Sequence, residues 1–62
     1  MTHYEISDLE LLSTSELKAL LFDLYDGNAG EILNGFHEMG IKEAKLKPAI
    51  IRYIVREQET NL

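Results

Sequence analysis

The chain contains no cysteine, so neither a disulfide nor a thiolate metal site can stabilise it. Its two histidines, His3 and His37, cannot complete a structural zinc site by themselves. With 62 residues the chain forms at most one domain, and a domain of this size buries only about 60% of the surface that its unfolded chain exposes. Well-capped helices and self-association are the remaining sources of stability, and no cofactor is expected.

Long apolar runs and an export signal are also missing. No apolar stretch approaches the roughly 20 residues that span a bilayer, and the N-terminus lacks the basic segment of a signal peptide. We therefore expect a cytoplasmic protein without membrane contact. The apolar fraction of 45% and the charged fraction of 27% are typical of a folded globular domain.

Basic residues are scarce in the first two thirds of the chain. The net charge is −5, from eleven acidic and six basic side chains, and Lys18 is the only basic residue before residue 42. The other basic residues are Lys42, Lys45, Lys47, Arg52 and Arg56. This asymmetry favours solubility and attraction between the two halves, and it also bears on the choice of partner.

The clearest local pattern is a helix start at Ser13. Ser13 and Glu16 have the spacing of a capping box, in which each side chain bonds the backbone N–H of the other residue. Leucines then recur at helical spacing, which predicts a helix over 14–25 that ends at Asp26-Gly27. Ser7 and Glu10 have the same capping spacing, which predicts a single helical turn over 8–12.

A second helix is predicted over 29–39, with Ile32, Leu33, Phe36 and Met39 as the apolar stripe that faces the core. Asn28 is expected to cap its start and Gly40 to follow its end as the C′ residue. Gly35, inside this helix, costs about 1 kcal/mol relative to alanine, and we expect it to mark the close approach of another helix.

The last helix is predicted over 48–59, although an extra turn within 42–46 stays open. Proline is favoured at the first helical position and disfavours helix in the residue before it, so Pro48 is expected to begin the helix. The chain is expected to fray from Gln58. Apolar residues cover about two thirds of the circumference of this helix. These residues are Ala49, Ile50, Ile51, Tyr53, Ile54 and Val55.

A helix with so wide an apolar arc is either central in its domain or shared with a second copy. The predicted fold is therefore all-α, a small three-helix bundle with a short N-terminal helical turn, in which the Pro48 helix is central.

No residue pattern supports catalysis or metal binding. His37 and Glu38 are adjacent in a predicted helix, where neighbours do not face each other. Counted from Asp26, the sixth and twelfth positions are Glu31 and His37, which rules out the glycine and glutamate of an EF-hand. We expect a protein that is not an enzyme.

The leading hypothesis is a small acidic protein-interaction module, a regulator or inhibitor that binds a protein partner and self-associates. Its acidic side chains would meet a basic partner and could imitate nucleic acid, while the wide apolar arc would form a homodimer. The residues predicted for these contacts are Glu10, Asp23, Asp26, Glu38, Ile51 and Val55.

Residues 31–54 also resemble the SAP-like helix–extended–helix motif. The segment EILNGFHEMGI ends in Gly-Ile like the first helix of that family, and KPAIIRYI is similar to the Lys-x-x-Leu-Ile-x-x-Ile that opens the second. The Ser-Gly that usually precedes the basic position is missing, and the first 26 residues have no counterpart. The resemblance implies nucleic-acid binding by the basic stretch 42–56. The residues nearest the phosphates would be Lys42, Lys45, Lys47 and Arg52, and Arg56 extends the same stretch.

Overall fold

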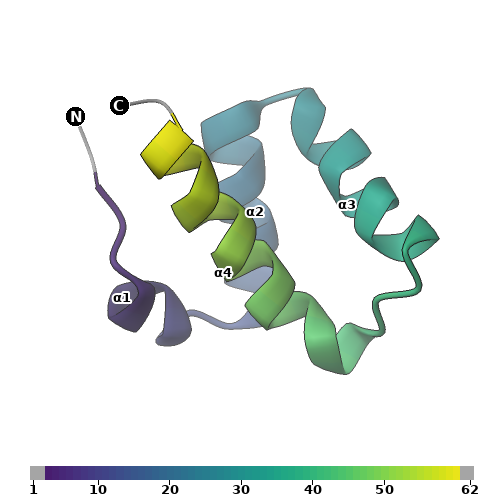
Figure 1. Ribbon diagram of the computed structural model, residues 1–62, viewed down its shortest axis with the longest axis horizontal. Helices are drawn as coiled ribbons and strands as arrows, with labels where there is room; N and C mark the ends of the chain where they lie inside the picture. Colours follow the sequence, from purple (N-terminus) through teal and green to yellow (C-terminus); the bar gives the residue numbers. More distant parts are fainter. Residues whose placement is uncertain (1–2, 61–62) are drawn as a thin grey trace.

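The computed structural model describes residues 3–60, which form four helices and no strand (Figure 1). The helices are α1 (Ile6–Glu10), α2 (Thr14–Tyr25), α3 (Asn28–Glu38) and α4 (Glu43–Thr60). The last three form a small bundle, and α1 is a short helical segment beside α4. The predicted all-α bundle is confirmed.

Helix α4 shares the central position of the fold with α2, since α4 packs against α1 and α2 while α2 packs against α3 and α4. Fully burying a leucine or isoleucine side chain stabilises a fold by about 1.5–3 kcal/mol, so α4 contributes much of the core energy. The buried core consists of Leu9, Leu17, Leu21, Ala29, Leu46, Ile50, Ile51 and Ile54.

The start of α2 is specified by its own residues. The Ser13 hydroxyl accepts a hydrogen bond from the Glu16 N–H at 3.2 Å, and the Glu16 carboxylate accepts one from the Ser13 N–H at 2.9 Å. These bonds satisfy two backbone N–H groups at the helix start that would otherwise lack protein partners. The predicted capping box is confirmed, and α2 ends at Tyr25 as expected.

The N-terminal turn begins earlier than predicted, over Ile6–Glu10 rather than 8–12. Ser7 therefore lies inside the helix, and Glu5 is the N-cap residue without a side-chain bond. A contact with a residue far along the chain positions α1 instead. The Gln58 side chain accepts a hydrogen bond from the Tyr4 N–H at 2.6 Å and donates one to the Tyr4 carbonyl at 2.9 Å.

This pairing also corrects the expectation that the chain frays from Gln58. Helix α4 continues to Thr60, and the Gln58 amide joins it to the segment before α1. The two partners are 54 residues apart in sequence, so no local pattern could show the contact.

The predicted cap at Asn28 is wrong, because Asn28 is already the first residue of α3. The connection from α2 is tighter than expected, and the Ala29 N–H donates to the Asp26 carbonyl at 3.1 Å. Asp26 has φ +53°, a conformation that favours glycine, whereas the neighbouring Gly27 is in the right-handed helical region.

The end of α3 is as predicted. Gly40 has φ +79°, the Gly40 N–H donates to the His37 carbonyl, and the Ile41 N–H donates to the Phe36 carbonyl. These two bonds form a Schellman ending. Gly35 lacks the expected close neighbour, since a Cβ added there would meet nothing within 4 Å.

Helix α4 begins at Glu43 rather than at Pro48, and Pro48 lies inside it. Proline cannot donate a hydrogen bond to the carbonyl of Ala44, one turn earlier. The added turn buries Leu46 in the core, at 8% exposure, which offsets that loss. Figure 1 shows this turn set at an angle to the rest of α4. Four residues, Met39 to Lys42, separate α3 from α4.

Candidate functional site

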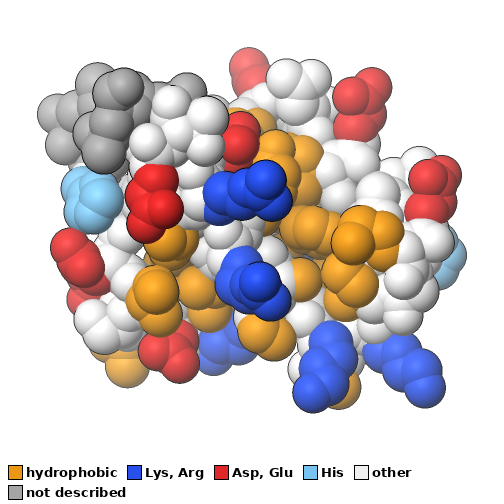
Figure 2. Space-filling model, viewed as in Figure 1, with side chains coloured by type: hydrophobic (Ala, Val, Ile, Leu, Met, Phe, Trp, Pro, Cys, Tyr) orange, Lys and Arg blue, Asp and Glu red, His pale blue; other side chains and the backbone are white. Residues whose placement is uncertain are grey.

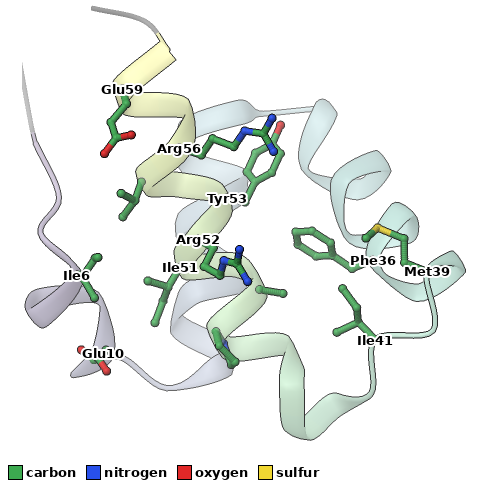
Figure 3. A pocket seen from close by; sticks show the side chains of 13 residues that line it. Ile6, Glu10, Phe36, Met39, Ile41, Ile51, Arg52, Tyr53, Arg56 and Glu59 are labelled. Carbon is green, nitrogen blue, oxygen red and sulfur yellow. The ribbon is translucent and has the colours of Figure 1, made fainter.

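An open groove of about 650 Å³ runs along the exposed side of α4 (Figure 3). We call it the α4 groove. One of its walls contains Ile6 of α1, and the opposite wall contains Phe36 and Met39 at the end of α3. Its full lining is Ile6, Glu10, Phe36, Met39, Ile41, Pro48, Ala49, Ile51, Arg52, Tyr53, Val55, Arg56 and Glu59.

Apolar side chains remain exposed on both walls. Met39 is 74% exposed and Ile6 is 53% exposed, although both are large apolar residues. Figure 2 shows apolar side chains on either side of a basic strip that follows α4. Contiguous exposed apolar surface that is bordered by polar groups often marks an interaction site.

Two arginines of α4 separate the apolar walls. Arg52 and Arg56 are one helical turn apart, about 6 Å along the surface, and both line the groove (Figures 2 and 3). Within residues 3–60 the ion pairs are His3 with Glu5 and Lys18 with Glu43, so neither guanidinium has a carboxylate partner there.

Aromatic rings fix the α3 side of the groove. The Tyr53 ring makes edge contacts with Phe36 of α3, at a centroid distance of 6.0 Å, and with Tyr25 of α2, at 5.6 Å. Burial raises the pKa of the Tyr53 hydroxyl, and the nearby Glu57 carboxylate raises it further. Tyr53 therefore stays neutral at physiological pH and gives the groove a rigid aromatic side.

The acidic residues predicted as one face do not lie together. Asp26 and Glu38 are at opposite ends of α3, a helix about 16 Å long, and Asp23 is near the end of α2. Glu10 lies apart from them, on the α1 side of the α4 groove (Figure 3). The structure thus distributes the negative charge over several surfaces.

The predicted dimer residues also differ in their exposure. Ile51 is only 5% exposed, because it belongs to the core that α1 and α4 share, so it offers little surface to a second copy. Val55 is half-buried and lines the α4 groove. The wide apolar arc of α4 is therefore largely used within the chain.

The basic residues fall into two groups. Lys45, Arg52 and Arg56 follow one strip of α4 at helical spacing. Lys47 instead points toward α1, where its ammonium donates to the Glu10 carbonyl at 2.7 Å. Lys42 lies in the α3–α4 connection and lines a second hollow with Lys18 and His37.

Sequence reasoning assigned Phe36 and Met39 to the core stripe of their helix and did not predict the groove. The useful signal was the Schellman ending, since it places Met39 at the C-cap and turns the chain toward α4. How much of Met39 stays exposed depends on the angle between α3 and α4, which no local pattern specifies.

Among residues 3–60, no cluster of three or more histidine, aspartate or glutamate side chains could hold a metal ion. None of the four helices in this part of the chain is both long and apolar enough to cross a bilayer. Comparisons with models of protein families, with curated proteins and with solved structures gave no match. What the protein binds must therefore be inferred from the chemistry of the α4 groove.

Proposed function

We propose that this protein is a small non-enzymatic protein-interaction module, a regulator or inhibitor, and that the α4 groove is its binding surface. The observation that carries this proposal is the combination of two exposed apolar walls with two arginines that have no carboxylate partner in the described chain. Aromatic residues, methionine and arginine are the residue types enriched in protein interfaces. The groove contains all three types.

The shape of the groove supports a macromolecular partner. Small-molecule sites enclose most of their ligand, whereas this groove is open along the length of α4. A side chain from a partner can enter on either side of the arginine strip. Buried anchors of this kind usually supply most of the binding energy of an interface.

Site-specific photo-cross-linking tests this proposal in cells that express the protein. A photoreactive amino acid replaces Met39, in the groove, or Phe22, which is 50% exposed on α2 outside it. We expect protein adducts of defined mass from position 39 and none from position 22. Equal adduct formation at the two positions would contradict the proposed site.

Nucleic-acid binding is a second candidate, because Lys45, Arg52 and Arg56 share one strip of α4. A net charge of −5 and a pI of 4.8 oppose it, since nucleic-acid-binding domains usually carry a basic footprint. Glu10 and Glu59 also line the groove and would repel phosphates. This candidate predicts binding to a DNA duplex or an RNA hairpin that weakens steeply as salt rises, because counterions are released on binding.

Self-association remains a proposal, in which a second copy covers the half-buried Val55 and competes with the partner for the groove. Analytical ultracentrifugation at high protein concentration tests it, and a monomer there would contradict it. A basic partner for the dispersed acidic residues also remains a proposal, and pull-down with a basic bait tests it. A cytoplasmic location is likewise a proposal, and cell fractionation tests it.

A further inference from the structure

We infer that the partner segment bound in the α4 groove is an acidic amphipathic helix. This inference rests on the proposed function and specifies its partner. The first argument is charge complementarity. Arg52 and Arg56 form a positive strip between two apolar walls, while Glu10 and Glu59 line the groove on the α1 side of this strip (Figure 3). The fitting segment therefore has its carboxylates over the two arginines and apolar side chains on both flanks.

The spacing of the arginines favours a helical partner. Two carboxylates four residues apart on a helix are separated by about 6 Å, which matches the spacing of Arg52 and Arg56. Each guanidinium can bind a carboxylate through two parallel hydrogen bonds, which fixes the orientation of the bound segment. Apolar side chains on the two flanks of this carboxylate row would then face the Met39 wall on one side and the Ile6 wall on the other.

The fold contains its own example of such a segment. Helix α1 is a short acidic amphipathic helix that packs on α4, with Leu9 fully buried and Asp8 and Glu10 exposed. Lys47 of α4 holds the C-terminal end of α1 by donating to the Glu10 carbonyl. Helix α4 thus already holds one acidic amphipathic segment through its apolar side and its backbone, while the carboxylates of that segment stay exposed.

Other occupants fit the α4 groove less well. A second copy related by a two-fold axis through the groove would place Arg52 and Arg56 against the same arginines. A membrane surface is nearly flat on this scale and cannot fill a groove. A nucleic acid has no apolar side chains to place against the exposed walls around Met39 and Ile6.

Selection from a random peptide library tests the inference directly. The probe is an mRNA-displayed library of random 16-residue peptides, selected against the full chain immobilised through its C-terminus. We expect the selected peptides to be enriched in aspartate or glutamate at i and i+4, with leucine, isoleucine, phenylalanine or methionine on both flanks. Circular dichroism of the best synthetic peptide should show helix on binding.

Matched variants then locate the binding. Arg52→Glu with Arg56→Glu should weaken the best peptide at least about ten-fold, because two attractive pairs become repulsive. Lys18→Glu with Lys42→Glu makes the same change in net charge at the second hollow, outside the α4 groove, and should change affinity by less than about three-fold. Met39→Ala, an exposed apolar wall residue, should weaken binding by about five-fold or more. The circular dichroism of each variant shows that it is folded.

The outcomes separate this inference from the proposed function. Selected peptides that are neutral or basic but still depend on Met39 would overturn the acidic partner and keep the groove as a protein-binding site. Selected peptides whose affinity does not change on substitution of Met39, Arg52 or Arg56 would overturn the inference and the proposed function together. Tighter binding to phosphatidylserine vesicles or to a 20-base-pair DNA duplex than to any selected peptide, or a dimer that blocks all peptides, would also overturn the inference.

Discussion

Helices α2 and α4 pack against each other, yet they are specified in different ways. Helix α2 begins at a capping box built from its own neighbours, Ser13 and Glu16. Helix α4 begins five residues before Pro48 and includes it, against the local preference of proline. Burial of Leu46, Ile50 and Ile54 holds α4 in place instead.

This difference shows which part of α4 is available for function. The buried side chains of α4 stabilise this helix in the way that the capping box stabilises the start of α2, so substitutions of these side chains reduce the stability of the fold. Its exposed side, with Arg52 and Arg56, makes no ion pair within residues 3–60. Substitutions on that side should therefore change binding more than stability.

The largest expected effect is on the buried side of α4. Ile54 is fully buried, and Ile54→Ala should reduce the free energy of unfolding by about 2–5 kcal/mol through lost burial and a residual cavity. A chain of this length has only about 3–9 kcal/mol of stability, so this variant should be close to unfolded at 37 °C. Urea unfolding followed by circular dichroism measures the loss. Val55→Ala, on the half-buried side of the same helix, is the control and should cost about 1 kcal/mol.

Replacing Pro48 tests how far the low helix propensity of proline opposes the burial that stabilises α4. Proline costs about 3 kcal/mol relative to alanine in a helix interior, so Pro48→Ala should raise the free energy of unfolding by up to that amount. The gain comes from a new hydrogen bond to the Ala44 carbonyl. Thermal unfolding measures it. A loss of stability would instead mean that the bend after the first turn of α4 is needed to bury Leu46.

The corresponding change at the start of α2 should be smaller. Ser13→Ala removes the acceptor for the Glu16 N–H and should cost about 1 kcal/mol. Ser15→Ala lies two residues away, is exposed, and should change stability by less than about 0.5 kcal/mol. If the two serines cost the same amount, the capping box does not determine where α2 begins.

The pH dependence of stability should report the same cap. The hydrogen bond from the Ser13 N–H, followed by the polar Ser13 side chain, lowers the pKa of the Glu16 carboxyl below its ordinary value of 4.5. A lowered folded-state pKa means that the stabilisation is complete above the unfolded-state pKa and is lost as pH falls through the folded-state value. The difference in stability between the wild type and Glu16→Gln should therefore be constant near pH 7 and shrink below about pH 4.5. A difference that grows on acidification would contradict this.

Local signals predicted the elements that local bonds determine. The capping box at Ser13 and the Schellman ending at Gly40 were both predicted, because each needs only a few neighbouring residues. The start of α1 was predicted wrongly, and the start of α4 was placed at Pro48 with an extra turn within 42–46 left open, which the structure contains. Both starts depend on distant contacts, the Tyr4–Gln58 pair and the burial of Leu46.

The candidate site shows the same division. The sequence predicted the basic stretch 42–56 and the wide apolar arc of the last helix, but it assigned Ile51 to a dimer contact although this side chain is only 5% exposed. It also predicted one acidic face, although Asp26 and Glu38 lie at opposite ends of α3. The groove wall around Met39 depends on how α3 meets α4, and that angle is a property of the whole fold.

The smallest expected effect on stability is also the most direct test of the central claim, that α4 folds through one side and binds through the other. In the variant with Arg52→Glu and Arg56→Glu, the free energy of unfolding and the affinity for the best selected peptide are measured on the same preparation. We predict that unfolding changes by less than about 1 kcal/mol, because both side chains are exposed surface positions, while affinity falls at least about ten-fold. Unchanged affinity with a large loss of stability would contradict the claim.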